Sequence, residues 1–169
     1  NKCFAEFLNF VDGMLFFRSL GQNSYIGIKE GSSQIAADII KKGHLRDFES
    51  FLNSAGISCK LKEIDIGDEL TIAFIIGSKA IPFYEIASMG TKTLSLFYYW
   101  FQRLEEEDKV SFVFVDEFDA FYHHDLSKLI VEKLKKINAQ VVMTTHNTSI
   151  MTNDLLRPDC YFLMWEDGI

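Results

Sequence analysis

Proline, cysteine and long apolar runs are all scarce in this 169-residue sequence. It has two prolines, and 48% of its residues are hydrophobic, which favours a packed body over a linker-rich one. Its three cysteines (Cys3, Cys59 and Cys160) lie far apart without a CxxC pair, which is typical of reduced thiols in a cytoplasmic protein. No apolar run reaches about 18 residues and no secretory signal opens the chain, so neither a membrane span nor export is expected.

The chain also lacks an excess of basic residues. Its formal net charge is −7, so a general nucleic-acid-binding surface is not indicated, although a local basic patch stays possible. Four lysines fall on one predicted helix: Lys128, Lys133, Lys135 and Lys136. A solvated helix face is the simpler interpretation of these lysines.

The length fits one domain or a large part of one. The first residue is Asn1 rather than methionine, and the last four residues, Glu166 to Ile169, resemble a turn that enters another strand. We therefore expect this sequence to be part of a longer protein.

Helices are predicted at the start of the chain. Apolar residues are frequent from Phe4 to Leu20, and Gly21 could end a helix there. One or two further helices are expected over residues 33–55, with an interruption at Gly43 and a stop at Gly56.

The hydrophobic period then changes to that of strands. Residues 70–76 and 80–86 predict a β-hairpin that turns at Gly77 and Ser78. Pro82 fits best on an edge strand, because proline cannot donate a ladder hydrogen bond.

Helices and strands alternate in the second half. Helices are predicted over residues 91–106, 125–137 and 149–155, and strands over residues 110–115, 140–144 and 160–165. This alternation is typical of a parallel sheet with helices packed on it, which is an α/β fold.

Two carboxylates and a histidine follow neighbouring strands of this predicted sheet. Asp116 and Glu117 come directly after one apolar run, and His146 follows the next. Their separation leaves room for a crossover helix, so the strand ends should lie side by side at the edge where α/β proteins bind ligands. One carboxylate could hold Mg²⁺ through its water shell, and the other could position an attacking water. The imidazole could hydrogen-bond a terminal phosphate, so the arrangement suits hydrolysis of a nucleotide phosphate.

Ser88 and Gly90 precede a predicted helix rich in aromatic residues. Free N–H groups at a helix N-terminus bind phosphate, and glycine allows a close approach of the backbone. An ordinary serine N-cap is the simpler interpretation of this segment.

A metal cluster is an alternative use of the same acidic region. Asp116, Glu117 and Asp119 could join His123 in a site for a metal-dependent nuclease or phosphatase. Adjacent histidines such as His123 and His124 rarely face one ion together, which makes this alternative weaker.

Together these segments resemble the C-terminal half of an ABC-type ATPase domain, of the bacterial AAA-labelled kind related to the RecF, SMC and OLD groups. Residues 113–119 resemble the Walker B motif with its adjoining catalytic acid, residues 119–123 the D-loop, and residues 144–146 the switch-histidine motif. Residues 87–91 resemble a degenerate signature motif. The order of the four motifs is that of the family.

The resemblance implies a P-loop NTPase-like core over residues 87–169, preceded by a helical lobe with a β-hairpin over residues 1–86. It implies that Asp116 assists Mg²⁺, Glu117 is the general base and His146 contacts the γ-phosphate of ATP. Ser88 and Gly90 would contact the ATP of the opposite subunit in a homodimer formed around the nucleotide.

No GxxxxGK[ST] phosphate-binding loop occurs in the sequence. We therefore expect the full-length protein to be an ATPase whose N-terminal segment supplies this loop, and the 169-residue chain to be inactive alone. Relatives by this resemblance serve in DNA repair, chromosome maintenance and phage defence. A non-catalytic interaction module is the remaining alternative.

Overall fold

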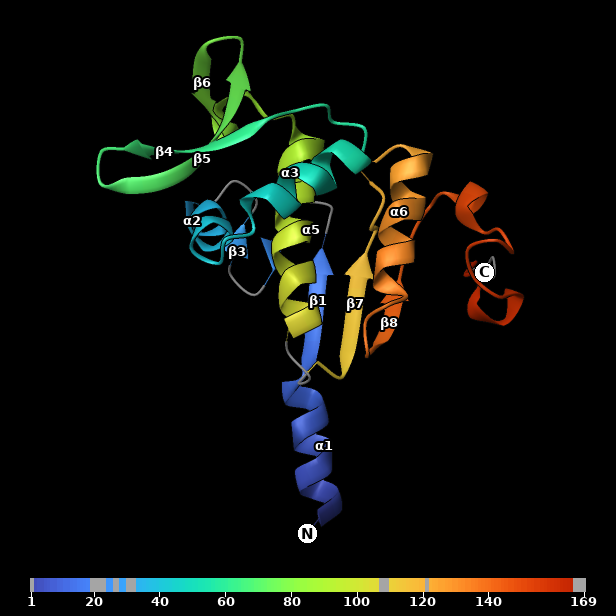
Figure 1. The fold of residues 1–169 in the computed structure, drawn as a ribbon. Helices are drawn as coiled ribbons and strands as arrows, with labels where there is room; N and C mark the ends of the chain where they lie inside the picture. The colour runs from blue at the N-terminus through green and yellow to red at the C-terminus, as the bar shows by residue number, and fades with distance from the viewer. Residues whose placement is uncertain are drawn as a thin grey trace.

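Two β-sheets and their packed helices make up the computed structural model of the chain (Figure 1). The structure describes residues 2–18, 24–25, 28–29, 33–106, 110–120 and 122–165.

The larger sheet has the strand order β3-β2-β1-β7-β8. Its strands are β1 (Met14–Arg18), β2 (Ser24–Tyr25), β3 (Ile28–Lys29), β7 (Phe112–Asp116) and β8 (Gln140–Met143). The central strands β1, β7 and β8 are parallel, whereas β2 and β3 join as antiparallel strands. The predicted α/β class with a largely parallel sheet and flanking helices is therefore confirmed.

Helices α5 (Met89–Glu106) and α6 (His124–Leu134) pack on one face of the parallel strands. Alternate residues of β7, Val113 and Val115, are buried on this face among apolar side chains of both helices. The opposite face is more open: Phe16 is 54% exposed there and stacks on Phe114 with ring centroids 5.2 Å apart. Both helices start at the end of the sheet to which the parallel strands point (Figure 1).

Helices α2 (Ser33–Lys41) and α3 (Leu45–Ser54) confirm the helices predicted before residue 56. Gly43 separates them with φ +73°, and Gly56 follows α3 with φ +83°. These left-handed conformations suit glycine because it has no Cβ.

The smaller sheet consists of β4 (Leu61–Ile66), β5 (Glu69–Ile76) and β6 (Lys79–Pro82), all antiparallel. It confirms the predicted hairpin and the edge position of Pro82, although the return strand gives way to the short helix α4 (Phe83–Ile86). Phe83 is buried and contacts the rings of Phe48 and Phe74, which joins this sheet to α3.

The helix predicted from Phe4 to Leu20 is wrong in its second part. Helix α1 (Lys2–Asp12) ends before Gly13, whose N–H donates to the carbonyl of Asn9, and strand β1 begins at Met14. A short apolar run such as residues 14–17 suits a buried strand as well as a helix, which is why the sequence pattern misled. Gly21 lies outside the described residues.

The strand predicted over residues 160–165 is also wrong. The 3₁₀ helix η2 (Pro158–Cys160) occupies its start, and residues 161–165 have no regular secondary structure. The helix predicted over residues 149–155 is limited to the 3₁₀ turn η1 (Thr148–Ile150). Within the described residues, no helix is both long and apolar enough to cross a membrane.

Candidate functional site

Strand β7 ends in a backbone conformation that places its two carboxylates differently. Asp116 is the last residue of the strand, and Glu117 follows with φ +47°. Among the described residues, Glu117 is the only non-glycine with a positive φ. Such a conformation is unfavourable for a residue with a Cβ, so the surrounding contacts must hold it.

Thr144, directly after β8, supplies those contacts. Its hydroxyl Oγ1 accepts the N–H of Glu117 at 2.7 Å and donates to Oδ1 of Asp116 at 2.8 Å. Its backbone N–H donates to the carbonyl of Val115 at 2.9 Å, and its carbonyl accepts from Phe118 at 3.1 Å. Four hydrogen bonds thus join Thr144 to the end of the neighbouring strand.

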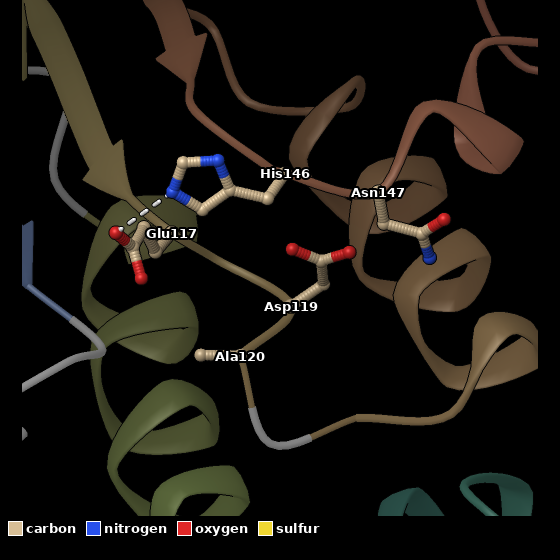
Figure 2. Close-up of a pocket in the computed structure, with 5 residues that line it drawn as sticks. All are labelled: Glu117, Asp119, Ala120, His146 and Asn147. Atoms are coloured by element: carbon tan, nitrogen blue, oxygen red, sulfur yellow. Dashed lines mark ion pairs between the residues drawn. The ribbon is translucent and has the colours of Figure 1, made fainter.

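Glu117 and His146 meet above the strand ends. Nε2 of His146 lies 3.3 Å from Oε1 of Glu117, and Figure 2 shows the imidazole reaching toward this carboxylate. The side chain of His146 is 90% exposed, whereas that of Glu117 is 25% exposed. The strand ends therefore converge as the sequence predicted, and the imidazole is free to contact a ligand from solvent.

An open depression lies beside this pair. Its volume is about 420 Å³, and Glu117, Asp119, Ala120, His146 and Asn147 line it (Figure 2). A second threonine orders its rim, because Oγ1 of Thr145 donates to Oδ1 of Asp119 at 2.7 Å and accepts from the N–H of Asn147 at 2.9 Å. The depression is wide enough to admit a charged group together with water.

Residues 13–152 match the protein-family model described as "AAA domain, putative AbiEii toxin, Type IV TA system". The chain belongs to this AAA-domain family. It is therefore an AAA-type ATPase-like domain. No curated protein matches the sequence.

Two solved structures are similar to this AAA-domain chain. One is the Smc head bound to the C-winged helix domain of ScpA, with a TM-score of 0.48, 18% identity, and 70% of this chain and 41% of that chain covered. The other is the Smc head domain of Pyrococcus furiosus, with an extended coiled coil and bound to the C-terminal domain of ScpA. Its TM-score is 0.41 at 17% identity, covering 63% of this chain and 29% of that chain. The AAA-domain chain thus spans less than half of either structure.

Ser88 and Gly90 lie at the start of α5, away from the lining of the depression. Oγ of Ser88 accepts the N–H of Thr91 at 3.2 Å, and the Ser88 carbonyl accepts the N–H of Lys92. Ser88 is therefore the N-cap of α5, which was the simpler of the two sequence interpretations. Nothing in this geometry brings Ser88 or Gly90 to Glu117 and His146 of the same chain.

The surroundings of Asp116 suit a hydrated magnesium ion. Oδ1 accepts a hydrogen bond from the hydroxyl of Thr144, Oδ2 lies 3.9 Å from Nε of the exposed Arg18, and the Asp116 side chain is 31% exposed. Mg²⁺ commonly uses one or two protein carboxylates and keeps several waters, so a single oxygen donor fits this ion.

The metal-cluster alternative finds no support in the described part of the chain. No group of three or more histidine, cysteine, aspartate or glutamate side chains there is close enough to hold a metal ion. His123 is exposed before α6, and Nδ1 of His124 lies 3.4 Å from the hydroxyl of Ser149.

Sequence reasoning identified the acids and the histidine but missed both threonines. The register of the two strands, which the sequence does not give, places Thr144 beside Asp116, because Val115 pairs with Met143 at the preceding position. Asn147 was also missed, because nothing in its sequence context distinguishes it from a turn residue.

Proposed function

We propose that this AAA-domain chain is part of an ATP-binding and ATP-hydrolysing enzyme of the ABC-like kind. The observation that carries the proposal is the contact between Glu117 and His146 at the ends of adjacent parallel strands. An acid and an imidazole placed together at this edge suit a terminal phosphate and the water that attacks it.

Glu117 is the proposed general base. In the reaction, the water oxygen forms a bond to the γ-phosphorus as the bond to the ADP oxygen breaks, and the water proton passes to Glu117. His146 would donate a hydrogen bond to the γ-phosphate from its exposed position. Asp116 would hold the water shell of Mg²⁺, and the ion would offset the negative charge of the phosphates.

The remaining parts of the site would come from outside the 169 residues. The sequence contains no GxxxxGK[ST] loop, so we propose that an N-terminal segment of the same protein supplies it. Ser88 and Gly90, which do not line the depression of their own chain, would complete the ATP site of a second copy, as the resemblance to a signature motif implies. The proposed assembly is therefore a homodimer with nucleotide between the copies.

The division into a lobe over residues 1–86 and a core over residues 87–169 stays a prediction, although β1 pairs directly with β7. A cytoplasmic location and a role in DNA repair, chromosome maintenance or phage defence also stay predictions.

The test is Glu117→Gln in the full-length protein. This change preserves shape but removes the base, so we expect about a 100-fold or greater loss of ATP turnover with ATP-driven dimerisation retained. Phosphate release and light scattering measure the two properties.

Glu63→Gln is the matched control, because Glu63 is an exposed residue of β4 remote from the depression. It should leave both properties unchanged. ATP turnover at the wild-type rate in Glu117→Gln would exclude Glu117 as the base.

A further inference from the structure

The hydroxyl of Thr144 is the only side-chain group, among the described contacts, that touches both residues of the acidic pair. It bonds the backbone of Glu117 and the carboxylate of Asp116 at once. We call this arrangement of Asp116, Glu117 and Thr144 the threonine clasp.

The direction of both hydrogen bonds follows from their chemistry. A backbone N–H can only donate, so the hydroxyl oxygen accepts from Glu117 at 2.7 Å. The hydroxyl proton is then free to point at Oδ1 of Asp116, 2.8 Å away, which accepts it as a carboxylate oxygen. Oδ1 of Asp116 is thereby engaged, and Oδ2 lies on the side of Arg18, 3.9 Å from its Nε.

The clasp also accounts for the unusual backbone of Glu117. Glu117 has φ +47°, and its peptide N–H needs an acceptor although the carbonyl of Thr144 is bonded to the next residue, Phe118. The Thr144 hydroxyl is that acceptor, and the Phe118 N–H continues the pairing to the Thr144 carbonyl. With the backbone held in this way, the Glu117 carboxylate reaches the imidazole of His146.

We propose that Thr144 is a positioning residue that fixes Glu117 and Asp116 for catalysis without contacting the substrate. This inference rests on the proposed function, since it assigns what orients the general base. The side-chain hydroxyl carries this role and the methyl group does not, so two substitutions at the same position separate them.

The experiment compares Thr144→Val with Thr144→Ser in the full-length protein. Valine keeps the branched shape and removes both hydrogen bonds, whereas serine keeps the hydroxyl and loses the methyl group. We expect kcat for ATP to fall about 10- to 100-fold in Thr144→Val with KM within about twofold, because the base is misplaced and not the binding surface. Thr144→Ser should retain kcat within about threefold.

Thr71→Val is the matched control, because Thr71 lies on β5 in the other sheet. It should leave kcat unchanged. Equal losses in Thr144→Val and Thr144→Ser would show a packing role and overturn the proposal, as would a wild-type kcat in Thr144→Val.

A spectroscopic signature tests the clasp without any turnover. With only glutamates isotope-labelled, the amide resonance of Glu117 is assigned by its absence in Glu117→Gln. We expect this resonance to move in Thr144→Val and to stay near its original position in Thr144→Ser. An unmoved resonance in Thr144→Val would overturn the clasp.

The kinetic and the spectroscopic measurements allow the threonine clasp and the proposed function to fail separately. If the wild-type protein shows no hydrolysis that depends on Glu117, the proposed function fails, and the Glu117 resonance still decides whether Thr144 holds its backbone.

Discussion

Glu117 has a strained backbone and is also the proposed general base. A left-handed conformation costs a residue with a Cβ roughly 1–2 kcal/mol relative to the right-handed one. In this chain, the strained residue is the one whose carboxylate contacts His146. Thr144 holds the backbone there, because its hydroxyl accepts the N–H of Glu117 and its carbonyl accepts the N–H of Phe118. Strain of this kind at a strand end directs a side chain away from the line of the strand.

Replacing Glu117 separates the strain from the carboxylate. Glycine adopts positive φ without a steric cost, whereas alanine keeps the cost and loses the same side chain. We expect Glu117→Gly to have a free energy of unfolding about 1 kcal/mol above that of Glu117→Ala, despite the larger chain entropy of glycine when unfolded.

Urea unfolding of the two variants measures this difference, and both should lack Glu117-dependent turnover. If Glu117→Ala were the more stable of the two, the left-handed backbone at residue 117 would be ruled out.

Among the elements, α5 begins with a side-chain cap that has two possible uses. Ser88 caps the helix through the N–H of Thr91, and the same residue is proposed to meet ATP across a dimer. An N-cap stabilises the folded protein whether or not nucleotide is bound, whereas the dimer contact matters only when nucleotide is present. The two roles therefore respond differently to a substitution that keeps the cap and adds charge.

Ser88→Ala and Ser88→Asp distinguish these roles. Alanine removes the cap and should lower the free energy of unfolding by about 1 kcal/mol, whereas aspartate is as good an N-cap as serine. Aspartate should nevertheless abolish ATP-driven dimerisation of the full-length Glu117→Gln protein, because its charge repels the phosphates of the partner's nucleotide.

Urea unfolding and light scattering measure the two effects, and Ser78→Asp in the exposed β5–β6 turn controls for added charge. Dimerisation that survives Ser88→Asp would limit Ser88 to its capping role.

The success of the element predictions depended on the kind of signal. Where glycine interrupted a helical period, as at Gly43 and Gly56, the boundaries were confirmed. The transition from α1 to β1 was missed because the apolar pattern continues across Gly13, and only tertiary pairing with β7 decides that Met14–Arg18 is a strand. A similar run near the C-terminus finds no strand partner among the described residues and forms none.

At the scale of the whole molecule, topology made the site predictable in outline. Parallel strands joined by a crossover helix bring their C-terminal ends to one edge, so the sequence order predicted that the residues after β7 and β8 lie near one another. The contact between Glu117 and His146 itself is a finding of the structure. The threonine clasp did not follow from that order, because it depends on the side-chain rotamer of Thr144 and on the turn at Glu117. The edge of the sheet is set by topology, whereas the orientation of each acid is set by local hydrogen bonds.

A site at the edge of the sheet also needs groups that hold the nucleotide, which leads to a prediction for the 169-residue chain itself. Its depression is lined by Glu117, the proposed base, and by His146, and Asp116 precedes Glu117 at the end of β7. Its sequence, however, holds no GxxxxGK[ST] loop to surround the α- and β-phosphates. Positioning and charge stabilisation provide most of the catalysis in phosphoryl transfer, so we expect no ATP turnover above background from these residues alone. Phosphate release with Mg²⁺ and ATP measures it, with the chain carrying Glu117→Gln as the background. Turnover that exceeds this background would mean that Glu117 and His146 act on ATP without a phosphate-binding loop, and the need for a segment outside these residues would be withdrawn.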